Sequence, residues 1–415
     1  MSSKNDQRKH GLACESVPFA QLAERYGTPL YVYSLTQIES QAAALFQAFG
    51  GQVHPHYAVK ANSNAAILDT VFKAGMGADV VSGGELLRVL HAGGAARQTV
   101  FSGVGKQDWE LELGLARSIE AFHAEGADEL GRLDTLARRL GKTAHVRLRV
   151  NPNIDAQTLP YIATGLHQTK FGIAESDLEA AVRLARSLSG LKLTGLSCHL
   201  GSQIQDAGVF RQAAEALVRW GQRLREGHPE FDSLDVGGGL GVRYQTETPP
   251  TVAAYAAALA PVAQAGFRLL IEPGRWIVAE AGTLLTRVIT VKSTPAKNFI
   301  VVDAAMNDLL RPALYEAFHP IAPVQPHEGI HTIADVVGPV CETGDFLGLD
   351  RRLPPVQAGD LLAIGVAGAY GASMASNYNS RPLPAEVAVR GSQSVCIRER
   401  QTIEEIFARE KKIPR

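Results

Sequence analysis

Short apolar runs of five to eight residues alternate with amphipathic segments from about Pro29 to Arg275. Eight of these runs have the length and composition of buried strands. They are His56–Lys60, Ala78–Ser82, Thr99–Gly103, Ser118–His123, His145–Val150, Leu193–Leu200, Ser233–Gly237 and Arg268–Glu272. Between them lie amphipathic segments such as Ala65–Ala74, Glu85–Ala92, Asp177–Leu188 and Val252–Gln264. Eight such repeats over roughly 250 residues predict a (β/α)8 barrel of the TIM type.

The pattern changes after the last of these runs, where short strand-like segments are split by glycine and proline. These segments are Thr283–Lys292, Phe299–Asp303, Ile330–Val337, Asp360–Gly365 and Glu386–Arg390. They predict a mostly β domain, as a Greek-key-like barrel or sandwich, and Thr402–Glu410 predicts a terminal helix. We therefore expect an α/β chain with a barrel domain over residues 28–276 and a β domain over 277–415. Residues 1–27 are expected to pack on the β domain.

Composition and charge exclude several classes of function. The 415 residues are 46% hydrophobic and 20% charged, with a net charge of -1, so nothing indicates a nucleic acid or an anionic membrane as partner. Residues 1–10 lack the apolar segment of a signal peptide, and the apolar stretch near Leu361–Tyr370 is too short to span a bilayer. The four cysteines lack metal-ligand spacing, so we expect no metal site and a reducing, cytoplasmic location.

Polar and glycine-rich motifs directly follow the predicted strands. In a (β/α)8 barrel the loops after the strands form the active face, so these motifs should gather at one end. The motifs are Lys60, Ser82-Gly83-Gly84-Glu85, Gly103-Val104-Gly105-Lys106, Arg149-Val150-Asn151-Pro152, His199-Leu200-Gly201-Ser202, Gly237-Gly238-Gly239 and Glu272-Pro273-Gly274-Arg275.

Lys60 follows the apolar run Tyr57-Ala58-Val59 and precedes a small polar turn. Partial desolvation at the end of a buried strand favours the neutral amine. That amine is a nucleophile for carbonyls and for the aldehyde of pyridoxal phosphate (PLP). A lone lysine is more often simply solvated, so the interpretation depends on the motifs at the same end of the barrel.

Two of those motifs suit a phosphorylated cofactor. Gly237-Gly238-Gly239 is either a plain turn or a backbone that approaches an anion, and the loops after strands seven and eight are the usual phosphate site of such barrels. Gly274 offers a second close approach there. Glu272 ends an apolar strand and needs a partner, which is either an arginine such as Arg275 or the pyridine nitrogen of PLP.

The remaining polar candidates of the barrel allow a structural and a functional interpretation. His199 is either a core histidine or a flat ring that stacks on a cofactor, with Ser202 donating to its phosphate. Asp79 is the candidate for electrostatic work near Lys60. Ser82 and Glu85 have the S-x-x-E spacing of a capping box, and we favour that structural interpretation.

The β domain carries a second set of candidates. Cys341 is by default a small buried apolar residue, and the alternative is a proton donor that reaches the barrel of another subunit. Arg311 and Tyr315 are four residues apart and should share a helix face. The arginine is either a solvated or capping residue or a fork for a substrate carboxylate.

Together these segments resemble the alanine-racemase-fold (type III) PLP-dependent decarboxylases. The segments are Tyr57–Asn62, Cys198–Gln203, Gly237–Gly239, Glu272–Arg275, Asp303–Tyr315, Gly338–Phe346, Gly368–Tyr370 and Ser376–Arg381. The resemblance extends from Gly27 to the terminal helix and is closest to bacterial members that convert meso-2,6-diaminopimelate to L-lysine and CO2. It implies a lyase of lysine biosynthesis that works as a homodimer with shared active sites.

The resemblance also implies a role for each candidate. Lys60 would bind PLP covalently, His199 would lie over its ring, and Glu272 would pair with the ring nitrogen. The other expected cofactor contacts are Asp79, Ser202, Gly237, Gly238, Gly239, Pro273, Gly274, Arg275 and Tyr370. The expected substrate contacts are Arg275, Arg311, Tyr315, Glu342 and Tyr370. Cys341 and Glu342 would reach the site of the partner subunit, and either Lys60 or Cys341 would return a proton to Cα.

One stretch departs from the family's pattern. Leu159, in Thr158-Leu159-Pro160-Tyr161, replaces the usual histidine before the proline, and residues 164–172 are unusual in their middle. This departure puts in doubt how the loop closes over the substrate. Cofactor binding is not affected, because the cofactor motifs lie elsewhere in the sequence.

Three other functions are considered. The first is decarboxylation of ornithine, arginine or carboxynorspermidine on the same scaffold, against which Arg311 and Tyr315 argue. The second is amino-acid racemisation, which favours an arginine opposite the ring nitrogen instead of Glu272. The third is a non-catalytic PLP-fold binding protein, against which the retention of Lys60, Glu272 and Cys341 argues.

Overall fold

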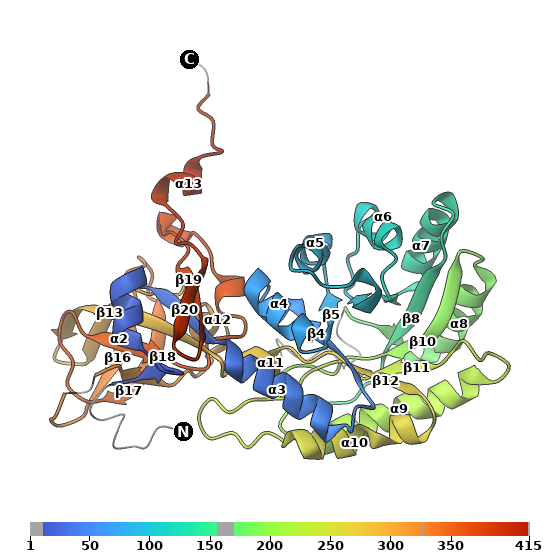
Figure 1. Ribbon diagram of the computed structural model, residues 1–415, viewed down its shortest axis with the longest axis horizontal. Helices are drawn as coiled ribbons and strands as arrows, with labels where there is room; N and C mark the ends of the chain where they lie inside the picture. The colour runs from blue at the N-terminus through green and yellow to red at the C-terminus, as the bar shows by residue number, and fades with distance from the viewer. Residues whose placement is uncertain (1–10, 156–169, 326, 414–415) are drawn as a thin grey trace. The chain divides into compact units, whose positions relative to one another are not determined.

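Figure 1 shows the computed structural model, which describes residues 11–155, 170–325 and 327–413. Its internal contacts divide the chain into two compact units. The barrel unit comprises residues 39–243 and 247–277, and the β unit comprises the chain up to Ile38, Tyr244–Thr246 and the chain from Val278.

Eight parallel strands form a closed ring in the barrel unit. They are β4 (His54–Ala58), β5 (Gly77–Val80), β6 (Thr99–Phe101), β7 (Ala121–Ala124), β8 (Ala144–Asn151), β10 (Leu191–Ser197), β11 (Ser233–Asp235) and β12 (Arg268–Ile271). Each strand pairs in parallel with the next, and β12 closes the ring on β4 with Leu270 opposite His54. The predicted barrel is therefore confirmed, and each predicted strand end lies within three residues of the observed one. A two-residue strand, β9 (Ile173–Ala174), extends β8.

Helices lie around the outside of this ring (Figure 1). They are α4 (Ala65–Lys73), α5 (Gly83–His91), α6 (Asp108–Arg117), α7 (Ala127–Arg139), α8 (Leu178–Ser187), α9 (Ala207–Arg225) and α10 (Val252–Gln264). In α8 the buried residues Leu178, Ala181, Val182 and Ala185 recur at helical spacing, so one stripe of the helix faces the strands. Side-chain caps from Asn64, Ser82, Asp206 and Thr251 fix where four of the helices begin.

The β unit is built on a mixed sheet with the strand order β17-β16-β14-β13-β3-β19-β20, and two further strands, β15 and β18, branch from it. The strands are β3 (Leu30–Ser34), β13 (Gly282–Ser293), β14 (Asn298–Val302), β15 (Ile321–Pro323), β16 (Thr332–Val337), β17 (Phe346–Leu353), β18 (Leu361–Ile364), β19 (Ala385–Arg390) and β20 (Gln393–Arg398). The long strand β13 pairs with β3 and β18 in its first half and with β14 in its second half. The predicted mostly β domain is thus present.

The ends of the chain belong to the β unit as well. The hairpin β1 (Ala13–Cys14) and β2 (Val17–Pro18) leads into α2 (Phe19–Tyr26), whose Phe19, Leu22 and Ala23 share an apolar cluster with β3, β13 and β19. The terminal helix appears as α13 (Ile403–Phe407), which begins at a capping box formed by Thr402 and Glu405. In the part of the chain that is described, no helix has both the length and the apolar character needed to cross a bilayer.

One boundary expected from the sequence differs from the observed strand pairing. Residues from 28 onward were expected to open the barrel, but β3 pairs antiparallel with β13 and parallel with β19. All five residues of β3 are buried, so this strand has the same continuous apolar pattern as a barrel strand. Its pairing partners, which local sequence does not specify, assign it to the β unit. The change of unit falls inside α3 (Leu35–Ala48).

Candidate active site

The carboxyl ends of the barrel strands carry the polar motifs that were predicted to meet there. Several of these motifs line a cavity of about 380 Å³ within the barrel unit. Its lining combines titratable side chains with the backbone of the loop after β6, and it includes Lys60, Gly103–Gly105, His123, Arg149, Cys198, His199 and Glu272. A concave, mixed polar and apolar cavity at this end of a barrel is the expected place for a small-molecule site.

Lys60 lies in a 3-10 turn (Val59–Ala61) that directly follows β4. Its side chain is 37% exposed, and its Nζ lies 3.4 Å from Oδ2 of Asp79, whose side chain is fully buried. The turn is held because Asn62 accepts a hydrogen bond from the Tyr57 hydroxyl through its carbonyl and one from the Asn64 N–H through its side chain. The lysine amine is therefore both positioned by the fold and accessible to a ligand in the cavity.

Asp79 and Glu272 are two buried carboxylates of the site: Glu272 lines the cavity, and Asp79 lies 3.4 Å from the Lys60 amine that does. Burial raises the pKa of Asp79, and the charge of Glu272 raises it further, while Lys60 acts in the opposite direction. Burial likewise raises the pKa of Glu272, and the positive charges of Lys60 and Arg149 oppose that shift. The site therefore balances acidic groups that resist ionisation against two cations that favour it.

His199 follows β10, and its Nδ1 lies 3.2 Å from the backbone N–H of Gly238, which donates to it. A ring nitrogen that accepts a hydrogen bond carries no proton, so the geometry describes a neutral imidazole. Burial, together with the charges of Lys60 and Arg149, lowers the pKa of His199 well below its ordinary value. A neutral flat ring at this place can lie against an aromatic ligand without adding charge.

The glycines after β11 bring the backbone close to neighbouring loops. Gly237 and Gly239 have φ values of 73° and 109°, which favour glycine. A Cβ on Gly238 would lie 2.1 Å from the carbonyl oxygen of Glu272, and one on Gly274 would lie 3.0 Å from Cβ of Ala58. No side chain fits at these positions, so the loops after β11 and β12 pack through backbone atoms.

Arg275 and Ser202 meet beside these glycines. The guanidinium donates to the Ser202 hydroxyl through Nη2 at 2.9 Å and through Nε at 3.3 Å. An arginine, a hydroxyl and glycine backbone at the ends of β10, β11 and β12 are the groups that proteins use for a phosphate ester. The structure thus brings together the predicted residues Ser202, Gly237–Gly239, Pro273, Gly274 and Arg275 in one part of the barrel unit.

Gly238→Ala is expected to destabilise the protein by about 1–3 kcal/mol, because the added methyl group forces the loops after β11 and β12 apart. Thermal unfolding measures the effect. Gly131→Ala is the matched control, since a Cβ at Gly131 on α7 meets nothing within 4 Å and alanine is the better helix former. Equal stability of the two variants would contradict the proposed tight backbone contact.

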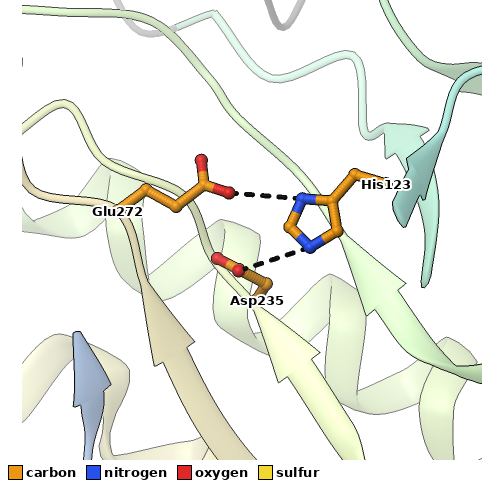
Figure 2. A group of neighbouring side chains, drawn as sticks. All are labelled: His123, Asp235 and Glu272. Carbon is orange, nitrogen blue, oxygen red and sulfur yellow. Dashed lines mark ion pairs between the residues drawn. The ribbon is translucent and has the colours of Figure 1, made fainter. Parts of the chain in front are cut away.

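Three residues that the sequence reasoning did not single out complete the site. Figure 2 shows His123 between Glu272 and Asp235, with Nδ1 3.2 Å from Oε1 of the glutamate and Nε2 3.7 Å from Oδ2 of the aspartate. The Ser102 hydroxyl donates to Oδ1 of Asp79 at 2.7 Å and lies 3.2 Å from Nδ1 of His123. A buried polar network therefore connects Lys60, through Asp79, to Glu272.

Arg149 is a further cation of the cavity, from the carboxyl end of β8. Its Nη1 donates to Oε1 of Glu125 at 2.7 Å, and its guanidinium lies 4.8 Å from the ring centre of Phe171. The other oxygen of Glu125 accepts the backbone N–H of Gly172 at 2.8 Å. These contacts hold the guanidinium in the cavity wall. The unusual positions Leu159 and 164–169 lie outside the described residues.

Ser82 and Glu85 take only part of the capping-box arrangement predicted for them. The Ser82 hydroxyl accepts the Glu85 N–H at 3.1 Å and caps α5. The Glu85 carboxylate accepts the N–H of Val81, one residue before the expected partner. The structural interpretation of the cap is confirmed for the serine.

Five predicted site residues lie in the β unit. Arg311 and Tyr315 are the first and last residues of the short helix α12 (Arg311–Tyr315). Arg311 is buried, its Nη1 lies 2.8 Å from Nε2 of His319, and its guanidinium lies 4.8 Å from the ring centre of Tyr244. The contacts with His319 and Tyr244 fix the orientation of the Arg311 guanidinium within the β unit.

Cys341, Glu342 and Tyr370 occupy loops of the β unit. Cys341 is exposed, and its backbone N–H donates to Oδ1 of Asn379 at 2.9 Å. The default expectation of a buried apolar cysteine is therefore wrong, because the residue lies in a surface loop after β16. Glu342 is exposed beside it, and Tyr370 is partly buried with a φ of 57°.

The barrel, its lysine and its phosphate-binding groups define a class of protein that comparison with known families identifies. A family model described as "Pyridoxal-dependent decarboxylase, pyridoxal binding domain" matches residues 35–279, so the chain belongs to the pyridoxal-dependent decarboxylases.

Curated relatives place the chain, more particularly, in the diaminopimelate decarboxylase family. The diaminopimelate decarboxylase of Neisseria meningitidis serogroup A is 48% identical over 402 residues, covering 96% of this chain and 98% of that protein. The Vibrio cholerae relative of the same name is 46% identical over 415 residues, covering 99% of each chain.

Solved structures agree with this placement. Diaminopimelate decarboxylase from Helicobacter pylori complexed with L-lysine has a TM-score of 0.91 and 39% identity, covering 94% of this chain and 98% of that chain. The enzyme from M. jannaschi has a TM-score of 0.92 and 35% identity, covering 98% and 99%. The resemblance found in the sequence motifs is confirmed over nearly the whole chain.

Proposed function

We propose that this PLP-dependent decarboxylase converts meso-2,6-diaminopimelate to L-lysine and CO2, the last step of lysine biosynthesis. The observation that carries the proposal is the near full-length identity to proteins named for this activity. The L-lysine complex of a structural relative at 39% identity supports the same product. The cavity supports the chemistry, since it holds a lysine amine and a buried carboxylate on one floor.

The residues of the cavity, with the glycine loops that adjoin it through the contact of His199 with Gly238, fit PLP. Lys60 would hold it covalently, Ser202, the three glycines and Arg275 would hold its phosphate, and Glu272 would pair with its ring nitrogen. When bound, PLP supplies the aldehyde for the substrate amine and an electron-accepting ring. The buried setting of Glu272 strengthens such a pair, because charges interact more strongly away from water.

The protein's own groups then perform the remaining tasks. His199, as a neutral ring, would cover one face of the cofactor and exclude water there. Asp79 lies 3.4 Å from the Lys60 amine and can hold its proton when the amine is released. Either Lys60 or Cys341 would return the proton to Cα after CO2 leaves.

Residues of the β unit would read the far end of the substrate in the assembled enzyme. Arg311 would bind the distant carboxylate, with Tyr315 beside it, and Glu342 would bind the distant ammonium. A site that pairs both charges rejects a substrate that lacks one of them by several orders of magnitude, because its own polar groups are left unpaired.

The substrate assignment is tested by measuring CO2 release from meso-diaminopimelate beside ornithine, arginine and lysine. We expect turnover of meso-diaminopimelate to exceed that of the others by about 10³-fold or more in kcat/KM. Comparable turnover of ornithine or arginine would contradict the diaminopimelate assignment and show that the enzyme decarboxylates another basic amino acid. Failure to bind PLP at all would favour a non-catalytic protein.

We further propose a cytoplasmic homodimer in which Cys341 and Glu342 complete the site of the partner subunit. Mixing two inactive variants, Lys60→Ala and Glu342→Ala, then restores activity, because half of the dimers are mixed and each has one intact site. About a quarter of the wild-type activity is expected after subunit exchange. Activity that stays at the level of the separate variants would contradict shared sites.

A further inference from the structure

His123 and Asp235 form a buried pair of titratable side chains. The proposed function does not say which of the two carries a proton on the atoms that face each other. Their side chains are 2% and 0% exposed, and Figure 2 shows that they face each other; they come from β7 and β11, which are not adjacent in the ring. Nε2 of His123 and Oδ2 of Asp235 have no hydrogen-bond partner within 3.5 Å among the described residues, and they lie 3.7 Å from each other. Two buried lone-pair atoms that face each other repel unless a proton lies between them.

The neighbouring hydrogen bonds show where that proton belongs. The Ser102 hydroxyl donates to Asp79, so it accepts from Nδ1 of His123, which also faces Oε1 of Glu272 at 3.2 Å. Nδ1 is therefore the protonated nitrogen, and Nε2 of a neutral ring is an acceptor. Oδ1 of Asp235 already accepts the Gly237 N–H at 2.9 Å, which leaves Oδ2 as the oxygen that bears the proton.

The charges around the imidazole favour this arrangement over an imidazolium or a metal ion. Arg147 and Lys106 act on the ring with positive charge, and Asp79, Asp235 and Glu272 surround it with carboxyl groups. Burial, with Arg147 as the next contribution, lowers the pKa of His123 well below its ordinary value. Burial and the charge of Glu272 raise the pKa of Asp235 well above its ordinary value. A neutral imidazole beside a protonated Asp235 agrees with the lowered pKa of His123 and the raised pKa of Asp235.

We propose that His123 is a positioning residue for Glu272, which it keeps ionised by leaving the shared proton of the cluster on Asp235. The protonated Nδ1 faces Oε1 of the glutamate at 3.2 Å, so the other carboxylate oxygen remains for the ring nitrogen of the cofactor. The protonated Oδ2 of Asp235 faces Nε2 at 3.7 Å on the opposite side of the imidazole and favours the tautomer that keeps Nε2 unprotonated. This inference rests on the proposed pairing of Glu272 with PLP, and it adds two residues that prepare the carboxylate before the cofactor binds.

The arrangement predicts opposite results for two substitutions in the same pair. Asp235→Asn replaces a protonated carboxyl with an amide, whose N–H still faces His123 and whose oxygen still accepts from Gly237. His123→Phe keeps a flat ring of similar size and removes the N–H that faces Glu272 and Ser102. Without that polar neighbour, Glu272 takes up a proton at higher pH, and a neutral carboxyl pairs poorly with a protonated ring nitrogen.

The experiment measures PLP affinity by fluorescence titration of the full-length apoenzyme from pH 6 to 9, without substrate. We expect Asp235→Asn to remain within about threefold of wild type at every pH. We expect His123→Phe to weaken PLP binding by about tenfold or more, with the larger loss at low pH, because the buried Glu272 carboxylate loses the polar N–H that faces it. Because no substrate is present, failure of the diaminopimelate assignment leaves this result unaffected.

Two outcomes would overturn the proposal. If Asp235→Asn weakens PLP binding as much as His123→Phe, Asp235 acts as an anion and holds no proton. If His123→Phe binds PLP with the wild-type pH profile, the imidazole only fills space. Asp235→Leu is measured in case the His123→Phe variant does not fold. Leucine has a similar volume to aspartate and no hydrogen-bond donor, so this variant is also expected to lose PLP affinity at low pH. Wild-type binding by the leucine variant would also overturn the proposal.

Discussion

Lys60→Ala is expected to lower kcat for decarboxylation by about 10³-fold or more, because the substitution removes both the covalent anchor of PLP and a proton-transferring amine. The side chain extends from a rigid turn after β4, so its loss should leave the barrel folded. The measurements are CO2 release and the visible absorption of the PLP-treated protein. The absorption band of bound PLP should change in the same variant that loses activity.

A matched control separates the amine from general effects of removing a lysine. Lys73 on α4 is 74% exposed and pairs with Asp69 on the same helix, so Lys73→Ala should keep wild-type activity. Adding a small primary amine should restore part of the activity of Lys60→Ala, because the cavity then contains the missing group. Activity of Lys60→Ala within tenfold of wild type would contradict the anchoring role.

Arg311→Lys is expected to lower kcat/KM for meso-diaminopimelate by roughly 30- to 100-fold, which corresponds to about 2–3 kcal/mol of lost charge-assisted hydrogen bonding. A lysine keeps the charge but cannot form two parallel hydrogen bonds to a carboxylate. The loss should fall mainly on KM, since the distant carboxylate takes no part in bond breaking.

The control for Arg311→Lys must exclude a loss of stability as the cause of the lower kcat/KM. The lysine also loses the contacts with His319 and Tyr244, so thermal unfolding has to be measured beside the kinetics. Arg352→Lys, at an exposed arginine of β17, should change neither quantity. An unchanged KM in a folded Arg311→Lys enzyme would show that another group binds the distant carboxylate.

The barrel could be predicted from the sequence because its strands are buried on both faces and its helices have one apolar stripe. Both patterns are local, so all eight strands were found and the motifs after them could be assigned to one end of the ring. The same logic brought Lys60 and Glu272 into one site, although more than 200 residues separate them in the chain.

The errors arise where the decisive interaction is not local. The run Leu30–Ser34 has the pattern of a barrel strand, and only its pairing with β13 and β19 assigns it to the β unit. His123 and Asp235 lie inside predicted strands, and no motif in the sequence marks them as site residues. A detectable signal existed, since Ser102, His123 and Asp235 are polar residues at the carboxyl ends of three predicted strands, but their pairing requires the closed ring.

The closure of β12 on β4 has a consequence for how the enzyme acquires its cofactor. Leu270 pairs with His54, so the ring cannot close until the last of its strands in the sequence has been synthesised. Lys60 follows the first strand of the ring and Glu272 follows the last. A nascent chain that has not yet released β12 therefore has an amine without its carboxylate partner. PLP should stabilise only the completed ring, so cofactor supply would act as a late checkpoint on newly made protein.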